Sequence, residues 1–223
     1  MERCLILTLI IFPLWGTGGF AQTAKEIIDK NIELSGGLAN WKRLNSVVLS
    51  GNVTLGINDK FPITIYQQRP NLTKTTIVID KKENTIEGFD GKKGYAMNYA
   101  ANKIQENPDY VPEGFDSDFM DWENKGFTAK YLGKEKAGST NCHKIELSKN
   151  SEKTYYYFSV SDFMLLKEEK KDETLIYSDY RKIGNLQFPF RIESSSATKD
   201  SDYVILLYKI ETNKTLPANT FKF

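Results

Sequence analysis

Side chains that commonly perform catalysis are scarce in this sequence. His143 is its only histidine, which excludes zinc sites built on several imidazoles and iron sites with two histidines. A nucleophile–histidine–acid triad would have to use His143, and no Gly-x-Ser-x-Gly elbow accompanies it. Cys142 precedes it, but neighbouring residues of a strand point to opposite faces, so a cysteine–histidine dyad is not expected. We therefore predict that His143 is a packed or edge residue of a strand.

Carboxylates are the remaining candidates for catalysis. The chain has 29 acidic residues, so a carboxylate pair of the glycosidase type stays open as an alternative. Most of these residues fall in turns or at outward-facing strand positions, which favours solvated surface charge. The run Asp90-Gly91-Lys92-Lys93-Gly94 lacks the spacing of a phosphate-binding loop and is predicted to be a hairpin turn. The sequence thus favours a protein that is not an enzyme and that uses no metal or cofactor.

The first 21 residues have the pattern of a secretory signal peptide. Arg3 precedes an apolar run from Leu5 to Trp15, and small residues follow, which predicts cleavage before Gln22. The apolar run has about 11 residues, whereas a helix that crosses a bilayer needs about 20, so no transmembrane segment is expected after cleavage. We expect export to the periplasm, with residues 22–223 forming a single domain.

Charge argues against some binding partners, and cysteine content excludes an internal disulfide. The formal net charge of +1 creates no basic field for nucleic acid or for an anionic membrane, so neither is expected as a partner. Cys142 is the only cysteine of residues 22–223, so the exported chain has no disulfide within itself. Its stability must come from a packed core.

Two short helices are predicted at the start of this domain. Thr23 is a candidate N-cap, and Glu26 three residues later completes a capping box. The run Ser35-Gly36-Gly37 ends that helix, and a second short helix is expected over residues 39–44.

From residue 46 onward the apolar period changes to two, which is typical of half-buried strands. Tight turns separate the segments, so the sequence predicts an antiparallel meander that curls into a barrel or a strongly bent sheet. The later strands are expected at about 61–69, 72–80, 84–90, 93–99, 127–132, 141–148, 153–160, 163–171, 173–181, 187–195 and 202–211.

Residues 101–126 interrupt the strand pattern. Two prolines and a glycine break any strand there, while Phe115, Phe119 and Trp122 have the spacing of one or two turns of amphipathic helix. Two interpretations stay open for this long connection. It is a lid across the mouth of a barrel, or it is a plug that completes the core.

The strand at 61–69 carries the clearest candidate for a binding role. Phe61, Ile63 and Ile65 share one face, and Arg69 extends that face to the end of the strand. A guanidinium at the rim of an apolar cavity could hold a lid carbonyl or a ligand head group, or it could simply extend into water over apolar surface. Met97, between Tyr95 and Tyr99, suits either an ordinary core or an apolar pocket.

Several short motifs, in order, resemble the LolA-type family of outer-membrane lipoprotein-sorting proteins and its Bacteroidetes-type relatives. The motifs are Gln68-Arg69-Pro70-Asn71-Leu72, Phe89-Asp90-Gly91-Lys92-Lys93-Gly94-Tyr95, Ser35-Gly36-Gly37 with Trp41, and Tyr177-Ser178-Asp179-Tyr180-Arg181 followed by Gly184 and Phe188-Pro189-Phe190. The resemblance spans about 25–211. It implies an unclosed antiparallel β-barrel, or strongly curved sheet, whose concave apolar face is covered by short helices and holds acyl chains.

The resemblance also implies roles for residues and partners. Arg69 matches the arginine that this family associates with closing the lid and passing the cargo onward, and no catalytic residue is implied. The hydroxyl-rich strand with Thr73, Thr75 and Thr76, and the acidic segment 113–123, depart from the carrier pattern and leave the cargo open.

Our leading hypothesis is a periplasmic carrier or sensor of hydrophobic ligands, namely the acyl chains of lipoproteins or lipids. Arg69 would couple the lid to the cavity, and five apolar side chains would form wall or lid contacts. These are Phe61, Ile63, Ile65, Met97 and Trp122. The main alternative is an envelope-stress or assembly module that contacts an envelope protein through the barrel rim. A carboxylate-dependent hydrolase is the second alternative.

Overall fold

The computed structural model describes residues 22–56, 59–112, 114–196 and 202–223. The predicted signal peptide, residues 1–21, lies outside them. Among the described residues are two helices, α1 (Ala24–Leu34) and α2 (Leu38–Arg43), and thirteen strands. The strands are β1 Ser46–Leu55, β2 Asp59–Gln68, β3 Leu72–Ile79, β4 Lys82–Phe89, β5 Gly94–Asn98, β6 Lys103–Glu106, β7 Thr128–Ala137, β8 Thr140–Lys149, β9 Glu152–Ser159, β10 Leu165–Glu169, β11 Glu173–Ile183, β12 Leu186–Ser196 and β13 Tyr203–Thr212.

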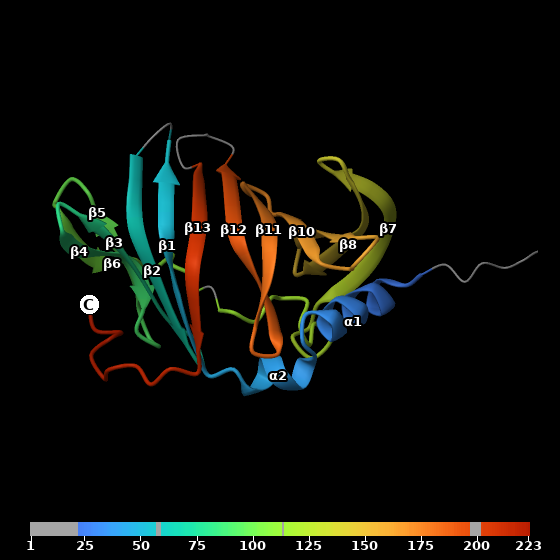
Figure 1. Ribbon diagram of the computed structural model, residues 1–223, viewed down its shortest axis with the longest axis horizontal. Helices are drawn as coiled ribbons and strands as arrows, with labels where there is room; N and C mark the ends of the chain where they lie inside the picture. The colour runs from blue at the N-terminus through green and yellow to red at the C-terminus, as the bar shows by residue number, and fades with distance from the viewer. Residues whose placement is uncertain (1–21, 57–58, 113, 197–201) are drawn as a thin grey trace, which may run out of the picture.

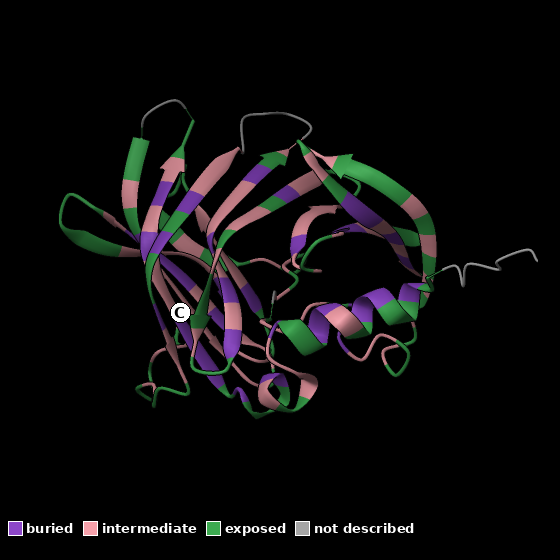
Figure 2. Cartoon of the chain, turned by 45° about the vertical axis from the view of Figure 1, so that its right-hand side comes forward, coloured by how far each residue is buried: buried purple, intermediate pink, exposed green. Residues whose placement is uncertain are grey.

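All thirteen strands belong to one antiparallel sheet with the order β6-β5-β4-β3-β2-β1-β13-β12-β11-β10-β9-β8-β7. The sheet is strongly curved and does not close, because β6 and β7 are its two edges (Figure 1). Figure 2 shows the sheet arching over α1, which lies on the concave side. The predicted unclosed, strongly curved sheet with short helices on its concave face is therefore confirmed.

The first and last strands pair with each other in the middle of the sheet. Val47 of β1 lies opposite Thr212 of β13, and the register shifts between Ser50 and Gly51. A Cβ atom at Gly51 would lie 2.4 Å from the carbonyl oxygen of Leu206, so this irregular pairing requires glycine. Every other strand pairs only with its neighbours in sequence.

Helix α1 begins and ends as the sequence predicts. The Glu26 N–H donates to Thr23 Oγ1 over 3.2 Å, and the Thr23 N–H donates to Glu26 Oε2 over 2.8 Å, which completes the capping box. Ile27 and Ile28 are fully buried against the sheet, and each such side chain contributes roughly 1.5–3 kcal/mol. Neither helix has the length or the apolar run that crossing a membrane requires, in the part of the chain that is described.

The connection between β6 and β7, hereafter the crossing segment, comprises residues 107–112 and 114–127 as described. Its two flanking strands are consecutive in sequence but lie at opposite edges of the sheet. The crossing segment must therefore span the open side of the sheet, and Figure 1 shows it in light green between the β6 side and the β7 side.

Two predictions for residues 101–126 are wrong. The segment includes a short strand, β6, which pairs with β5 and precedes the prolines that were expected to exclude strands. The described residues around Phe119 form successive turns instead of an amphipathic helix; for example, the Met120 N–H donates to the Ser117 carbonyl over 2.9 Å. Asp121 has a φ of 58°, and this left-handed residue interrupts any helix between Phe119 and Trp122.

Phe119 anchors the crossing segment in the core. Its side chain is 3% exposed and meets the rings of Tyr156 and Phe158 edge-on, with centroids 5.2 and 5.3 Å away. Such edge-to-face pairs add to the free energy gained by burying the ring. The crossing segment therefore contributes directly to the core.

We expect Phe119→Ala to lower the free energy of unfolding by about 3–5 kcal/mol. The substitution removes a large ring and leaves a space that the neighbouring side chains of β9 cannot fill. Urea denaturation measures the effect. Val111→Ala is the matched control, since Val111 lies in the same segment but is 78% exposed, and it should change stability by less than about 0.5 kcal/mol. Equal stability of the two variants would contradict this role of Phe119.

Candidate functional site

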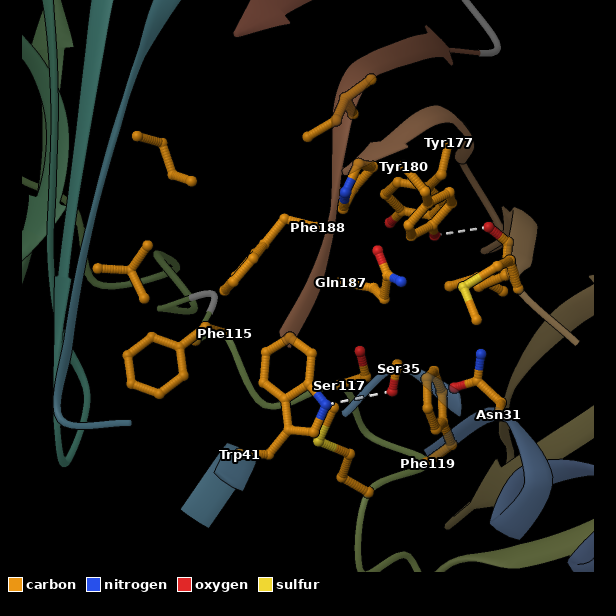
Figure 3. Close-up of a pocket in the computed structure, with 18 of the residues that line it drawn as sticks. Asn31, Ser35, Trp41, Phe115, Ser117, Phe119, Tyr177, Tyr180, Gln187 and Phe188 are labelled. Carbon is orange, nitrogen blue, oxygen red and sulfur yellow. Dashed lines mark hydrogen bonds between the residues drawn. The ribbon is translucent and has the colours of Figure 1, made fainter. Parts of the chain in front are cut away.

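A cavity of about 210 Å³ lies between the concave face of the sheet, the helices and the crossing segment (Figure 3). Its walls are mainly aliphatic, aromatic and thioether side chains. The lining residues are Asn31, Ser35, Trp41, Val47, Leu49, Gln67, Gly114, Phe115, Ser117, Phe119, Met120, Met164, Leu165, Tyr177, Tyr180, Gln187, Phe188, Pro189, Ile192 and Leu207. The composition is that of a site for an apolar ligand with a few polar contacts.

Most polar groups around the cavity are committed to the protein itself. Asn31 Nδ2 donates to the Phe163 carbonyl over 2.7 Å, and Tyr180 donates its hydroxyl to the Leu165 carbonyl, also over 2.7 Å. Ser35 Oγ accepts from Trp41 Nε1 over 3.2 Å. Burial raises the pKa of the Tyr180 hydroxyl far above its usual value, so this group stays a neutral donor.

Arg69 joins the sheet, helix α2 and the crossing segment at one end of this cavity. Its Nε donates to the Leu44 carbonyl over 2.7 Å, and Nη2 donates to the Trp41 carbonyl over 3.2 Å. Nη2 also donates to Asp116 Oδ1 over 2.8 Å, while Nη1 pairs with Asp116 Oδ2. The guanidinium carbon lies 4.9 Å from the ring centroid of Phe115, a cation–π contact. The geometry uses the planar fork of arginine, which lysine lacks.

Two further polar contacts hold the crossing segment. Lys125 Nζ donates to the Ser117 carbonyl over 2.9 Å, and Lys42 of α2 pairs with Asp121 over 3.2 Å. Burial lowers the pKa of Lys125 from its ordinary value, against the opposing effect of nearby aspartates. The crossing segment is thus fixed by an apolar anchor inside and by charged contacts at its surface.

The six residues predicted for the site do not all come together. Ile63 is buried in the core, and Phe61, Ile65 and Trp122 pack against that core. None of these four lines the cavity. Arg69 is not part of the lining either; it binds Asp116 of the crossing segment, which covers the cavity.

Met97 lies on the other face of the sheet from Ile65. Residues that pair across antiparallel strands share a face. The pairs Tyr66–Lys74, Lys74–Gly88 and Gly88–Tyr95 connect β2 to β5 along one face. Ile65 precedes Tyr66 and so points to the opposite face, whereas Met97 follows Tyr95 by two positions and shares its face. Phe223 stacks on Tyr95 there, with ring centroids 4.5 Å apart.

Sequence reasoning missed the wall that β10 to β12 provide. Tyr177 and Tyr180 both line the cavity although they are three positions apart in one strand. Asp179 between them has a φ of 54°, which shifts the alternation of side chains. The sequence motifs that contain Trp41 and Phe188 could have indicated this wall. Their two rings meet beside the cavity, with centroids 5.3 Å apart.

His143 is packed, as predicted, and lies away from the cavity lining. It is 2% exposed, stacks on Phe163 with ring centroids 5.5 Å apart, and its Nδ1 lies 3.2 Å from the Tyr131 hydroxyl. Burial lowers the pKa of the imidazole, with a smaller effect from Lys134. The neutral form is therefore the one that the fold accommodates.

Three solved structures share this fold over most of their length. A LolA superfamily protein from Nitrosomonas europaea aligns with a TM-score of 0.58 and 15% identity, covering 91% of this chain and 99% of its own. A domain from Vibrio parahaemolyticus described as outer membrane lipoprotein-sorting gives 0.57 and 11%, covering 88% and 95%. A DUF1329 family protein from Desulfovibrio piger gives 0.57 and 10%, covering 89% and 97%. No protein-family model and no curated protein matches the sequence.

The class defined by fold and site is an open antiparallel sheet wrapped around a covered apolar cavity. The fold is the LolA-type fold, and the resemblance inferred from the sequence motifs is confirmed at the level of fold.

We expect the free energy of unfolding to fall as the pH drops below about 6.5, the unfolded pKa of histidine, because only the unfolded chain then protonates readily at His143. Above that pH the contribution of His143 is constant. His143→Gln, which stays neutral, should show a shallower decrease between about pH 6.5 and pH 5, with a difference of at most about 1.4 kcal/mol per pH unit. Urea denaturation at a series of pH values measures this. Parallel pH profiles for the two proteins would count against a neutral buried His143.

Proposed function

We propose that this protein is a non-enzymatic periplasmic carrier or sensor that binds a hydrophobic ligand, the acyl chain of a lipoprotein or lipid, in the cavity under the crossing segment. The single observation that carries the proposal is an apolar cavity, on the concave face of a LolA-type fold, whose cover is held by Arg69. The described residues that line the cavity include no carboxylate, histidine or cysteine. That composition supports binding over hydrolysis.

The size of the cavity supports a proposed movement of the crossing segment when a long acyl chain binds. Its volume of about 210 Å³ lies below the about 300–1,000 Å³ of pockets that enclose drug-sized ligands. A long acyl chain therefore needs more room than this volume offers. Displacement of the crossing segment, which supplies Phe115, Phe119 and Met120 to the wall, would enlarge it.

The energies of opening and binding are of comparable size. Exposing Phe119 and Met120 would each cost roughly 1.5–3 kcal/mol. The Arg69–Asp116 side chains are 31% and 30% exposed, and ion pairs near the surface are typically worth about 0–1 kcal/mol. Burying an acyl chain of about 16 carbons contributes on the order of 10 kcal/mol before association costs. Ligand binding can thus offset the opening, which favours the lid interpretation of the crossing segment.

We expect delipidated protein to form a one-to-one adduct with a fluorescent acyl probe in native mass spectrometry. Leu49→Trp fills the cavity and should weaken probe binding at least about tenfold, a loss of about 1.4 kcal/mol or more. Leu206→Trp is the matched control, because Leu206 is an exposed residue of the neighbouring strand β13. A bare mass for the unsubstituted protein at saturating probe would overturn the proposal, and capture of one stoichiometric envelope protein by that empty form would favour the interaction module.

We expect Arg69→Leu to fold and to release bound acyl probe faster, because Asp116 and Phe115 both lose their contact with the sheet. Stopped-flow transfer of the probe to vesicles measures the release rate. Arg69→Lys is the conservative comparison: it keeps the charge but loses the paired hydrogen bonds, so its rate should be intermediate. Equal release rates in all three proteins would remove Arg69 from the mechanism.

A further inference from the structure

We propose that the ligand places a carbonyl group inside the cavity and that Gln187 recognises it, so that the ligand is an acyl amide or acyl ester and not a plain hydrocarbon. This inference rests on the proposed acyl-binding function and specifies the chemistry of its ligand. Gln187 is a polar side chain in a largely apolar wall.

The backbone holds Gln187 firmly at the cavity. It is the second residue of β12, directly after the tight turn that follows β11. Its N–H donates to the Ser35 carbonyl at the end of α1 over 2.9 Å. Gly36, the next residue along, approaches this turn so closely that a Cβ atom would lie 2.3 Å from the Asn185 carbonyl oxygen. The position of Gln187 is therefore fixed by both the sheet and the helix.

The side chain of Gln187 is directed into the cavity. Figure 3 shows its amide in the space between the Tyr177–Tyr180 pair and Ser35. Its carboxamide makes no hydrogen bond or ion pair with any of the residues that the structure describes. Tyr180 and Asn31 beside it donate to backbone carbonyls, and Ser35 Oγ donates to the Ile32 carbonyl and accepts from Trp41 Nε1. Gln187 thus presents two donors and an acceptor that the protein does not use.

An unused amide selects against a purely apolar ligand. Before binding, water can satisfy the Gln187 carboxamide. An alkyl chain that displaces this water leaves the amide unpaired, which lowers affinity roughly 5- to 150-fold, the equivalent of about 1–3 kcal/mol. A ligand carbonyl restores the lost hydrogen bond by accepting from Gln187 Nε2, and the rest of the chain occupies the apolar wall. The cavity therefore discriminates between ligands of equal length.

The test compares three ligands of one chain length: N-methyldecanamide, methyl decanoate and decane. Each competes with a bound fluorescent acyl probe on the full chain, and the readout is the Kd of each ligand. The unsubstituted protein should bind both carbonyl ligands at least about fivefold more tightly than decane. Tighter binding of the amide assigns an amide linkage, and equal binding of amide and ester assigns recognition of the carbonyl alone; both support the proposal.

Gln187→Met replaces the amide with an apolar side chain of similar shape. It should bind decane more tightly and the carbonyl ligands more weakly, so that the preference falls at least about fivefold. Gln187→Leu serves the same purpose if the methionine variant does not fold, and Gln105→Met, at an exposed position of β6, is the control that should keep the preference.

An unchanged preference in folded Gln187 variants, or no preference in the unsubstituted protein, overturns this inference and leaves the proposed function standing. Failure of the unsubstituted protein to bind the fluorescent probe or any of the three ligands overturns both.

Discussion

The structure depends on one side chain that meets three elements at the same place. Arg69 follows β2, donates to two carbonyls at the end of α2, and pairs with Asp116 of the crossing segment. The carbonyls at a helix end have no partners within the helix, so a guanidinium there satisfies the helix as well as the carboxylate. Since the same group also stacks on Phe115, one planar cation sets the relative positions of sheet, helix and cover. Arg69 therefore fixes the crossing segment to the sheet and to α2 in this structure.

Different interactions hold the inner and the outer side of the crossing segment. Inside, Phe119 is held by ring packing, which is unaffected by salt and strong in total. Outside, Asp116 and Asp121 are held by half-exposed charges, which are weaker and screened by ions. A ligand that replaces the inner contacts with its own apolar surface leaves only the outer ones to be broken. This division fits the proposed lid role of the crossing segment, because its outer contacts can break without unfolding the sheet.

Patterns among neighbouring residues predicted much of the fold, whereas the residues that line the cavity are determined by pairing between strands far apart in the sequence. The Thr23 capping box, the alternating strands and the packed His143 follow from neighbouring residues alone. The cavity wall could be predicted only from the order of the strands in the sheet, because β13 lies between β1 and β12 and brings them close together. Met97 was assigned to the wall by its apolar character, but three successive strand registers determine its face. Left-handed residues at Asp121 and Asp179, which are not glycines, altered the helical and strand periods that the pattern predicted.

The pairing of the first strand with the last has a consequence for how the chain assembles. The meander β1–β6 and the meander β7–β13 each consist of sequence-local pairings, and only β1–β13 joins them side by side. Closing that long loop has the largest entropic cost of any strand pairing, so it is expected to form late in folding. Leu49 on one side of the joint and Leu207 on the other both line the cavity. A ligand that contacts both side chains would therefore stabilise the pairing of β1 with β13, because it would bind the assembled sheet and not the separated meanders.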